Sequence, residues 1–202
     1  MVKKQLLLYI FFFNNLNAIS QSFTDPRDGT EYSIITIGEF TWFAENLNFD
    51  IQGSFCYDNE EKNCDKYGRL YKWEVALAAC PEGWHLSTEY EWQHLEFDLG
   101  MDFKELSYNR NRGVNEGGKM KQGGESGLNI LYGGWRRKDG TYSSLGKNAA
   151  LWTSTEADLN HAWHRDIDEG DDFSFRSRVV KSYSLSCRCV KNYNTDDVSE
   201  DN

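Results

Sequence analysis

The sequence predicts an α+β fold built from a hairpin, two helices, a long irregular loop region and further hairpins near the C-terminal end. Three observations lead to this prediction: two alternating β-rich runs, two segments with apolar residues at helical spacing, and a glycine-rich stretch without any period. At 202 residues the chain is long enough for one domain with a sizeable core, and its aromatic content of 15% predicts a core rich in aromatic side chains.

The N-terminal segment has the pattern of a secretory signal peptide. A short basic region at residues 3–4 precedes an apolar run over residues 6–13, which is too short to span a bilayer as a helix. Ala18 and Ser20 then supply the small residues that signal peptidase selects. We therefore expect residues 1–20 to be removed. The mature protein is expected to lack a membrane span and to be exported to the periplasm, the cell surface or the medium.

The first elements of the mature chain are expected to be a hairpin and a helix. The runs "EYSIITI" and "FTWFAENL" alternate in the manner of strands and are separated by Gly38 and Glu39, which is a hairpin signal. In "YGRLYKWEVALAAC", the residues Trp73, Leu77 and Cys80 fall at helical spacing, so this segment is expected to form the first helix.

A second helix is expected after a short extended piece. Thr88 and Glu91 form the T-x-x-E pattern of a capping box, which satisfies two amide groups at a helix N-terminus. Trp92, Leu95 and Leu99 follow at intervals that place them on one helical face. This segment is therefore predicted to begin a helix at residue 89 or close to it.

The second half of the chain is expected to be a loop followed by paired strands. Residues 100–134 are rich in glycine but contain no phosphate-binding motif, and they predict a long surface loop, a common location of binding sites. "YGGWRRKDGTYSS" predicts a hairpin with a type I′ turn at Asp139 and Gly140. "AALWTSTE" is expected to pair with "NHAWHRDID", and "DDFSFRS" with "YSLSCRCVKN". The domain is expected to cover residues 23–194, and residues 195–202 to be a disordered acidic tail.

Export gives the five cysteines a structural meaning, because thiols outside the cytosol are commonly oxidised to disulfides. Cys56 and Cys64 enclose a polar turn and are expected to form a local disulfide. Cys80 is expected to pair with a distant cysteine near the C-terminus, either Cys187 or Cys189, which leaves one cysteine over.

The charge and the motifs argue against several function classes. A formal net charge of −10 excludes a nucleic-acid partner, and the one basic cluster, Arg136 to Lys138, is followed directly by Asp139. Cys80 and His85 lie on opposite sides of a proline turn, so a thiolate–imidazole pair is not expected there. The sequence contains no H-E-x-x-H, C-x-x-C or G-x-S-x-G pattern, so neither catalytic residues nor a cofactor are predicted.

Two groups of residues are candidates for ligand contacts. Asp166, Asp168 and Asp171 could offer oxygen ligands to Ca²⁺, although a solvated acidic turn is favoured and no metal is predicted. Tryptophan rings stack on sugars, so the candidates for ligand binding are the late aromatic residues with a neighbouring histidine: Trp135, Trp152, Trp163 and His164.

Several motifs in the same order resemble the Fibrobacter major paralogous domain, which occurs in exported and surface proteins of Fibrobacteres and Bacteroidetes. They are "GEFTWFAENLN", "CYDNEEKNCDKYGRLYKWEVALAACPEGWHL", "GGWRRKDGTYSSLGKNAALWTSTE" and "SLSCRCVKN", and the resemblance spans about Asp25 to Asn192. The family is similar to C-type-lectin-like and formylglycine-generating-enzyme folds, which implies two helices against small, twisted antiparallel sheets. The resemblance also implies that Cys189 is the partner of Cys80, and that Cys187 stands where the family usually has an apolar residue.

These observations predict an exported, disulfide-stapled, lectin-like binding module. Its expected partner is a polysaccharide or a surface protein, recognised through the 100–150 loop region and the late strands. The alternatives are a secreted enzyme of the formylglycine-generating type and a purely structural surface protein.

Overall fold

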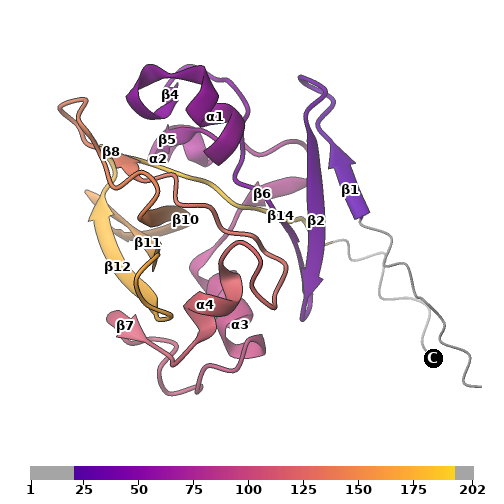
Figure 1. Ribbon diagram of the computed structural model, residues 1–202, viewed down its shortest axis with the longest axis vertical. Helices are drawn as coiled ribbons and strands as arrows, with labels where there is room; N and C mark the ends of the chain where they lie inside the picture. The colour runs from indigo at the N-terminus through magenta and orange to yellow at the C-terminus, as the bar shows by residue number, and fades with distance from the viewer. Residues whose placement is uncertain (1–20, 194–202) are drawn as a thin grey trace, which may run out of the picture.

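The computed structural model describes residues 21–193, so the predicted signal peptide and the predicted acidic tail 195–202 lie outside the described residues. Of the described residues, 38% lie in strands and 17% in helices, and the strands form three antiparallel sheets (Figure 1). The protein is therefore mostly β, and the prediction of an α+β fold is wrong. The helical segments are too short to form a layer, since the four α-helices described contain between 4 and 10 residues.

Sheet A joins the N-terminal hairpin to the C-terminal end of the domain, on the right of Figure 1. The predicted hairpin is confirmed, because Ile35 pairs with Trp42 and Gly38 has a positive φ of 58° in the turn. The order of the strands in sheet A is β1 (Gln21–Thr24), β2 (Glu31–Ile37), β3 (Phe40–Phe43), β14 (Cys189–Lys191) and β6 (Trp84–Leu86).

Sheet B consists of five short strands that come from distant parts of the chain. Their order is β4 (Ser54–Phe55), β5 (Leu70–Lys72), β13 (Ser184–Leu185), β8 (Trp135–Arg136) and β9 (Tyr142–Ser143). The hairpin of β8 and β9 confirms the predicted pairing, but not the type I′ turn. Asp139 lacks the positive φ that such a turn needs, because its carboxylate accepts the Thr141 amide at 2.9 Å, and only Gly140, with φ of 91°, is left-handed.

Sheet C contains the longest strands of the molecule, and β11 and β12 lie on the left of Figure 1. The predicted pair of β10 and β11 is confirmed. The predicted pairing of "DDFSFRS" with the C-terminal strand is wrong: a short turn folds β12 back onto β11, and β7 takes its other edge. The strands, in order, are β10 (Asn148–Asp158), β11 (His161–Asp168), β12 (Ser174–Val180) and β7 (Arg110–Arg112).

One of the two predicted helices forms in full. Helix α3 (Glu89–Asp98) begins with the predicted capping box, in which Thr88 Oγ1 accepts the Glu91 amide at 3.1 Å. The other is reduced to the single turn of α2 (Trp73–Ala76), since the preceding residues join sheet B and the chain bends before Pro81. Three short segments were not predicted: η1 (Tyr57–Asn59), α1 (Glu61–Tyr67) and α4 (Glu116–Met120). Within residues 21–193, no helix combines the length and apolar character needed to cross a bilayer.

The core is aromatic, as the composition predicts. Two hydrophobic clusters fill it, one that includes Tyr71 and Trp152 and one that includes Trp42 and Trp92. The three tryptophan side chains have no exposed surface. Rings of this size bury a large apolar area each, so they supply much of the driving force for packing the sheets together.

A buried ion network fixes α3 to sheet C. Glu96, which is fully buried, accepts hydrogen bonds from Arg165 Nε at 2.8 Å, from Ser174 Oγ at 2.6 Å and from Arg112. Arg165 also donates to Glu89 at 2.7 Å. Burial lowers the pKa of Arg112 to about 10, although Glu96 partly compensates. Because Glu96 and Glu89 bind guanidinium groups from sheet C, the network positions α3 against that sheet.

Candidate functional site

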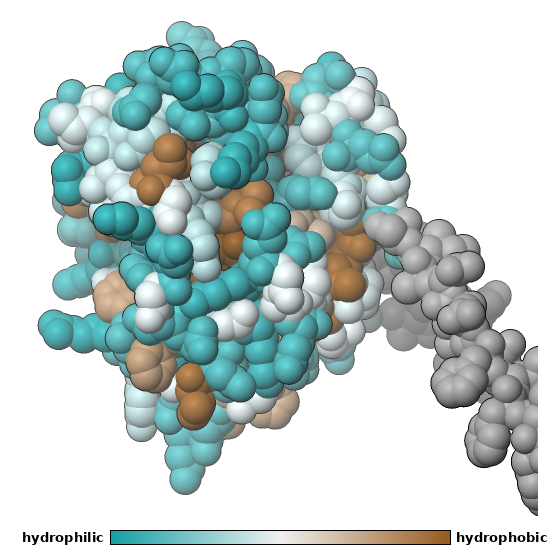
Figure 2. All heavy atoms as spheres, in the orientation of Figure 1, coloured by the Kyte–Doolittle hydropathy of each residue, from teal (hydrophilic) through white to brown (hydrophobic). Residues whose placement is uncertain are grey.

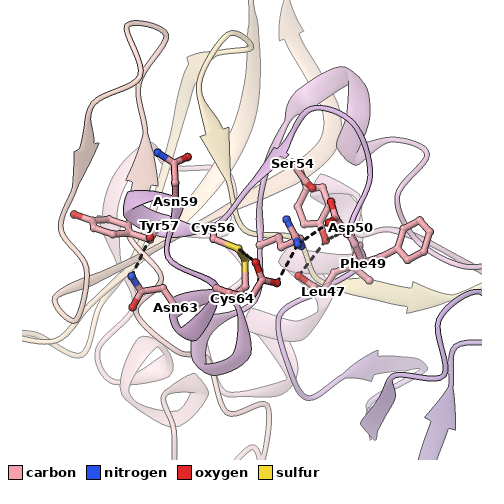
Figure 3. Close-up of a disulfide and its surroundings, with 12 residues drawn as sticks. Leu47, Phe49, Asp50, Ser54, Cys56, Tyr57, Asn59, Asn63 and Cys64 are labelled. Atoms are coloured by element: carbon pink, nitrogen blue, oxygen red, sulfur yellow. Dashed lines mark hydrogen bonds and ion pairs between the residues drawn. A yellow bond between two sulfur atoms is a disulfide. The ribbon is translucent and has the colours of Figure 1, made fainter.

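Two disulfides hold the domain together. Cys56–Cys64 joins the start of η1 to α1, with Cα atoms 5.0 Å apart, and Figure 3 shows it beside the hydrogen bond from Asn63 to the Tyr57 carbonyl. Cys80 bonds to Cys189 across 109 residues of sequence. The predicted pairing of Cys56 with Cys64 is confirmed. Of the two predicted partners of Cys80, Cys187 and Cys189, the structure shows Cys189.

Cys187 is the cysteine left over, and its thiol is fully buried. Burial raises the pKa of this thiol well above its ordinary value. A protonated, inaccessible thiol is a poor nucleophile. Cys187 therefore packs in the core as an apolar side chain does, and it lines neither of the two concave sites described below.

The segment from Cys80 to Trp92 is a structural corner of the domain. His85 Nε2 lies 2.7 Å from a Glu91 carboxylate oxygen, and Nδ1 lies 2.7 Å from the Asn192 side-chain oxygen. The hydrogen bond with Glu91 raises the pKa of His85 above its ordinary value. His85 thereby ties the start of α3 to the C-terminal end of sheet A.

The three aspartates of the acidic run line one pocket of about 220 Å³ but do not form a tight group of metal ligands in the described part of the chain. The oxygens of Asp166, Asp168 and Asp171 do not gather within 4.8 Å of one another. Asp168 and Asp171 instead accept backbone amides two residues further on, as in solvated turns. One cluster does meet that distance, Cys56 with Glu61 and Cys64, but its sulfurs are already joined in a disulfide and cannot act as thiolate ligands.

A pocket of about 220 Å³ lies between β8 and the strands β10 to β12. It brings together two of the sequence-predicted candidates, Trp135 and His164, and also Asp166 from the acidic run. We call it the Trp135 pocket, and the residues that define it are Trp135, Arg137, Ala150, His164, Asp166 and Tyr183.

Strand pairing explains why these side chains meet. Ala150 lies opposite Asp166, and Trp152 opposite His164, so all four side chains share one face of sheet C. The His164 ring is fixed on both sides, with Nδ1 2.9 Å from the Ser177 carbonyl oxygen and Nε2 2.9 Å from the Asp166 carboxylate. The pair of His164 and Asp166 thus forms a rigid polar edge beside the aromatic wall.

The other two candidate tryptophans lie elsewhere. Trp152 is completely buried, and its Nε1 donates to the Tyr71 carbonyl at 2.8 Å, so it supports the pocket from below without reaching solvent. Trp163 is half-buried and points to the opposite face of sheet C, where the Arg176 guanidinium stacks 3.7 Å from its ring centre. Neither side chain lines the Trp135 pocket.

A larger groove of about 780 Å³ runs along the outer face of sheet B, beside the turn between β10 and β11. Its lining is strongly basic, although the chain as a whole has 22 basic and 32 acidic residues. Four Lys or Arg side chains line it against one acidic residue, Glu74. We call it the basic groove, and its cations are Lys72, Arg136, Lys138 and Lys181.

The cations of the basic groove are mostly free of ion pairs. Within the described residues, Lys181 is the only one of the four in an ion pair, with Glu156 at 2.7 Å. Lys72 and Lys138 are exposed. Because a cluster of unpaired cations repels itself, the site has a local positive potential that an anionic group would relieve.

Arg136 is held in place by aromatic rings. Its guanidinium carbon lies 3.9 Å from the centre of the Phe55 ring and 5.7 Å from that of Tyr142. Its Nε is buried and has no hydrogen-bond partner among the described residues. Stacking fixes the plane of a guanidinium without using its N–H donors.

The segment around β8 separates the two sites. Trp135 and Arg137 line the Trp135 pocket, whereas Arg136 and Lys138 line the basic groove. Trp135 and Arg136 are successive residues of β8 and so point to opposite faces, and Arg137 and Lys138 follow them at the start of the turn. The basic cluster noted in the sequence is therefore divided between two surfaces.

Sequence analysis missed the basic groove. Its cations lie between residues 72 and 181, on strands and turns that are far apart in the sequence. No short sequence pattern therefore predicts that they share one groove. Only the run from Arg136 to Lys138 stands out as a basic cluster in the sequence.

On the face shown in Figure 2, apolar side chains form small separate groups among hydrophilic ones, so this face offers no broad apolar surface for a partner.

The fold and these sites define a small, mostly β domain, stabilised by two disulfides, with two adjoining concave surfaces. The model of the Fibrobacter succinogenes major domain family matches residues 35–191, and the chain belongs to this family. No curated protein and no solved structure matches the chain, so nothing supports the expected likeness to C-type-lectin or formylglycine-generating-enzyme folds. Family and disulfides together are consistent with a stabilised extracellular domain.

Proposed function

We propose that this protein is an exported binding module that recognises a polysaccharide through the Trp135 pocket. The observation that carries the proposal is the convergence of two aromatic side chains, Trp135 and Tyr183, with polar groups held in fixed positions. An apolar ring face can stack on the aromatic wall, while hydroxyl groups can bond to Arg137 and to the Asp166 carboxylate that His164 holds in place.

The volume of the Trp135 pocket suits a ligand about as large as one sugar residue. Its volume of about 220 Å³ is below the roughly 300–1,000 Å³ typical of sites for drug-sized ligands. One sugar unit of a longer chain suits such a volume. Export is supported by the signal-peptide pattern of residues 1–20 and fits the presence of disulfides.

A glycan array with the purified, oxidised protein tests the proposal, followed by titration calorimetry on the polysaccharides that bind. We expect Trp135→Ala to weaken binding at least about tenfold, since central aromatic contacts commonly contribute more than 1 kcal/mol. Trp163→Ala is the matched control, because it removes a half-buried tryptophan from the opposite face of sheet C.

The result that refutes the proposal is binding that survives in Trp135→Ala or falls equally in Trp163→Ala. Near-ultraviolet circular dichroism establishes that both variants are folded. A protein that binds no glycan on the array would instead point to a protein partner.

A further inference from the structure

We propose that the ligand is an acidic polysaccharide, and that the basic groove binds its carboxylate or sulfate groups. This inference rests on the proposed function and specifies its substrate class. Four cations against one carboxylate line the groove of a chain whose net charge is −10. The net charge of the chain disfavours an anionic polymer, whereas the groove offers it a local excess of positive charge.

Arg136 provides the most specific contact. Its guanidinium is stacked on Phe55, the side chain lines the groove, and none of its N–H groups donates to another described residue. Planar, two-pronged donation from a fixed guanidinium matches the geometry of a carboxylate or a sulfate. A side chain that was only part of a salt-bridged surface would be paired with an acidic neighbour, as Lys181 is with Glu156.

The cations also lie at one level of sheet B. Lys72 of β5 and Arg136 of β8 each pair with Ser184 of β13, so their side chains stand in one row across the sheet. Lys138 extends the row along the β8 side. A row of charges suits a linear polymer with repeated anionic groups better than a single small anion.

The two sites are placed to act on one polymer chain. Trp135 and Arg136 are neighbours in sequence, and Val179 and Tyr183 line the pocket while the three residues between them, 180–182, line the groove. The Trp135 pocket can hold a sugar ring while the basic groove binds acidic groups of nearby units. Short spacing along one polymer raises the effective concentration of the second contact.

The test uses three polymers: polygalacturonate, the same polymer with its carboxyl groups reduced to alcohols, and dextran sulfate. We expect the oxidised protein to bind polygalacturonate or dextran sulfate at least tenfold more tightly than the reduced polymer. The two acidic polymers distinguish carboxylate from sulfate recognition. Binding of the acidic polymer is expected to weaken steeply between 50 and 500 mM salt, because the Debye length falls from roughly 14 to 4 Å over that range.

Two groove variants locate the effect. Arg136→Gln and the double variant Lys72→Gln with Lys138→Gln are each expected to lose about tenfold in affinity for the acidic polymer, with binding of the reduced polymer unchanged. The charge-matched control is Lys62→Gln with Lys104→Gln, which removes two exposed cations outside the groove.

The outcomes separate this inference from the proposed function. Equal binding of the acidic and reduced polymers, or equal losses in groove and control variants, would overturn the inference while Trp135-dependent binding stands. Binding that does not depend on Trp135 would overturn the proposed function itself. Loss of acidic-polymer affinity in the groove variants alone, with Trp135 also required, supports both.

Discussion

Removal of the Cys80–Cys189 disulfide is expected to cost the domain a large part of its stability. The bridge spans 109 residues, and loop-closure entropy in the unfolded chain then contributes about 4.8 kcal/mol. Domains of this kind commonly have a total unfolding free energy of about 5–15 kcal/mol. The variant Cys80→Ala with Cys189→Ala should therefore unfold at a much lower urea concentration than the parent protein.

Equilibrium urea unfolding without reductant gives the measurement, and two further variants act as controls. Cys187→Ala removes a buried sulfur from the same core cluster but breaks no covalent bond, so its cost corrects for lost packing. Removal of Cys56–Cys64, whose sequence separation is 8, should cost only about 2.6 kcal/mol. The prediction is refuted if removal of Cys80–Cys189, after this correction, does not lower the unfolding free energy more than removal of Cys56–Cys64.

Three other predictions follow from buried or paired groups. Glu96→Gln should lower the free energy of unfolding by roughly 3–5 kcal/mol in urea titrations, because it leaves the buried guanidinium groups of Arg112 and Arg165 without a counter-charge. A loss below about 1 kcal/mol would contradict the stabilising role given to this ion network. The pKa of His85 is raised in the folded protein, so its charged form stabilises the fold fully below the unfolded pKa of about 6.5, and this stability is lost as the pH rises through the folded pKa. The difference in unfolding free energy between the parent protein and His85→Gln should therefore shrink as the pH rises over this range. A difference that stays constant with pH would refute the prediction. Thiol labelling should be slow in the native oxidised protein and reach one site per chain after unfolding, whereas rapid native labelling would contradict the burial of Cys187.

Local patterns in the sequence were sufficient where neighbouring residues decide the structure. The capping box at Thr88 and the turn at Gly38 depend on a few adjacent residues, and both predictions are confirmed. The helix expected from Trp73 to Cys80 fails because tertiary contacts override its spacing. Sheet B takes the residues just before Trp73, and the disulfide and Pro81 fix the far end.

Long-range pairing was the part that the sequence could not specify. The alternation in "DDFSFRS" correctly predicts a strand, but it does not say whether β11 or a C-terminal strand is the partner. The fold class was wrong for a related reason. Very short strands such as β4, β8 and β13 carry little periodic signal, yet together they form a complete sheet.

The candidate site was predictable only in part. Trp135 and His164 were chosen for their chemistry, and the structure places them in one pocket, whereas burial of Trp152 depends on packing that no single strand reveals. The Cys56–Cys64 disulfide was predictable from the short polar turn that it encloses, and the family resemblance singled out Cys189 as the partner of Cys80. The basic groove required the full topology, since Lys72 and Lys138 come from separate strands of the sheet.

The bond between Cys80 and Cys189 also closes most of the domain into a covalent ring. The glycine-rich stretch 100–134 lies inside this ring, and its exposed turns outside β7 and α4 are preferred targets of proteases. One backbone cut there opens the ring but releases no fragment, so the severed ends stay tethered and the sheets keep all their strands. A nicked molecule would therefore run as two pieces in electrophoresis only after reduction.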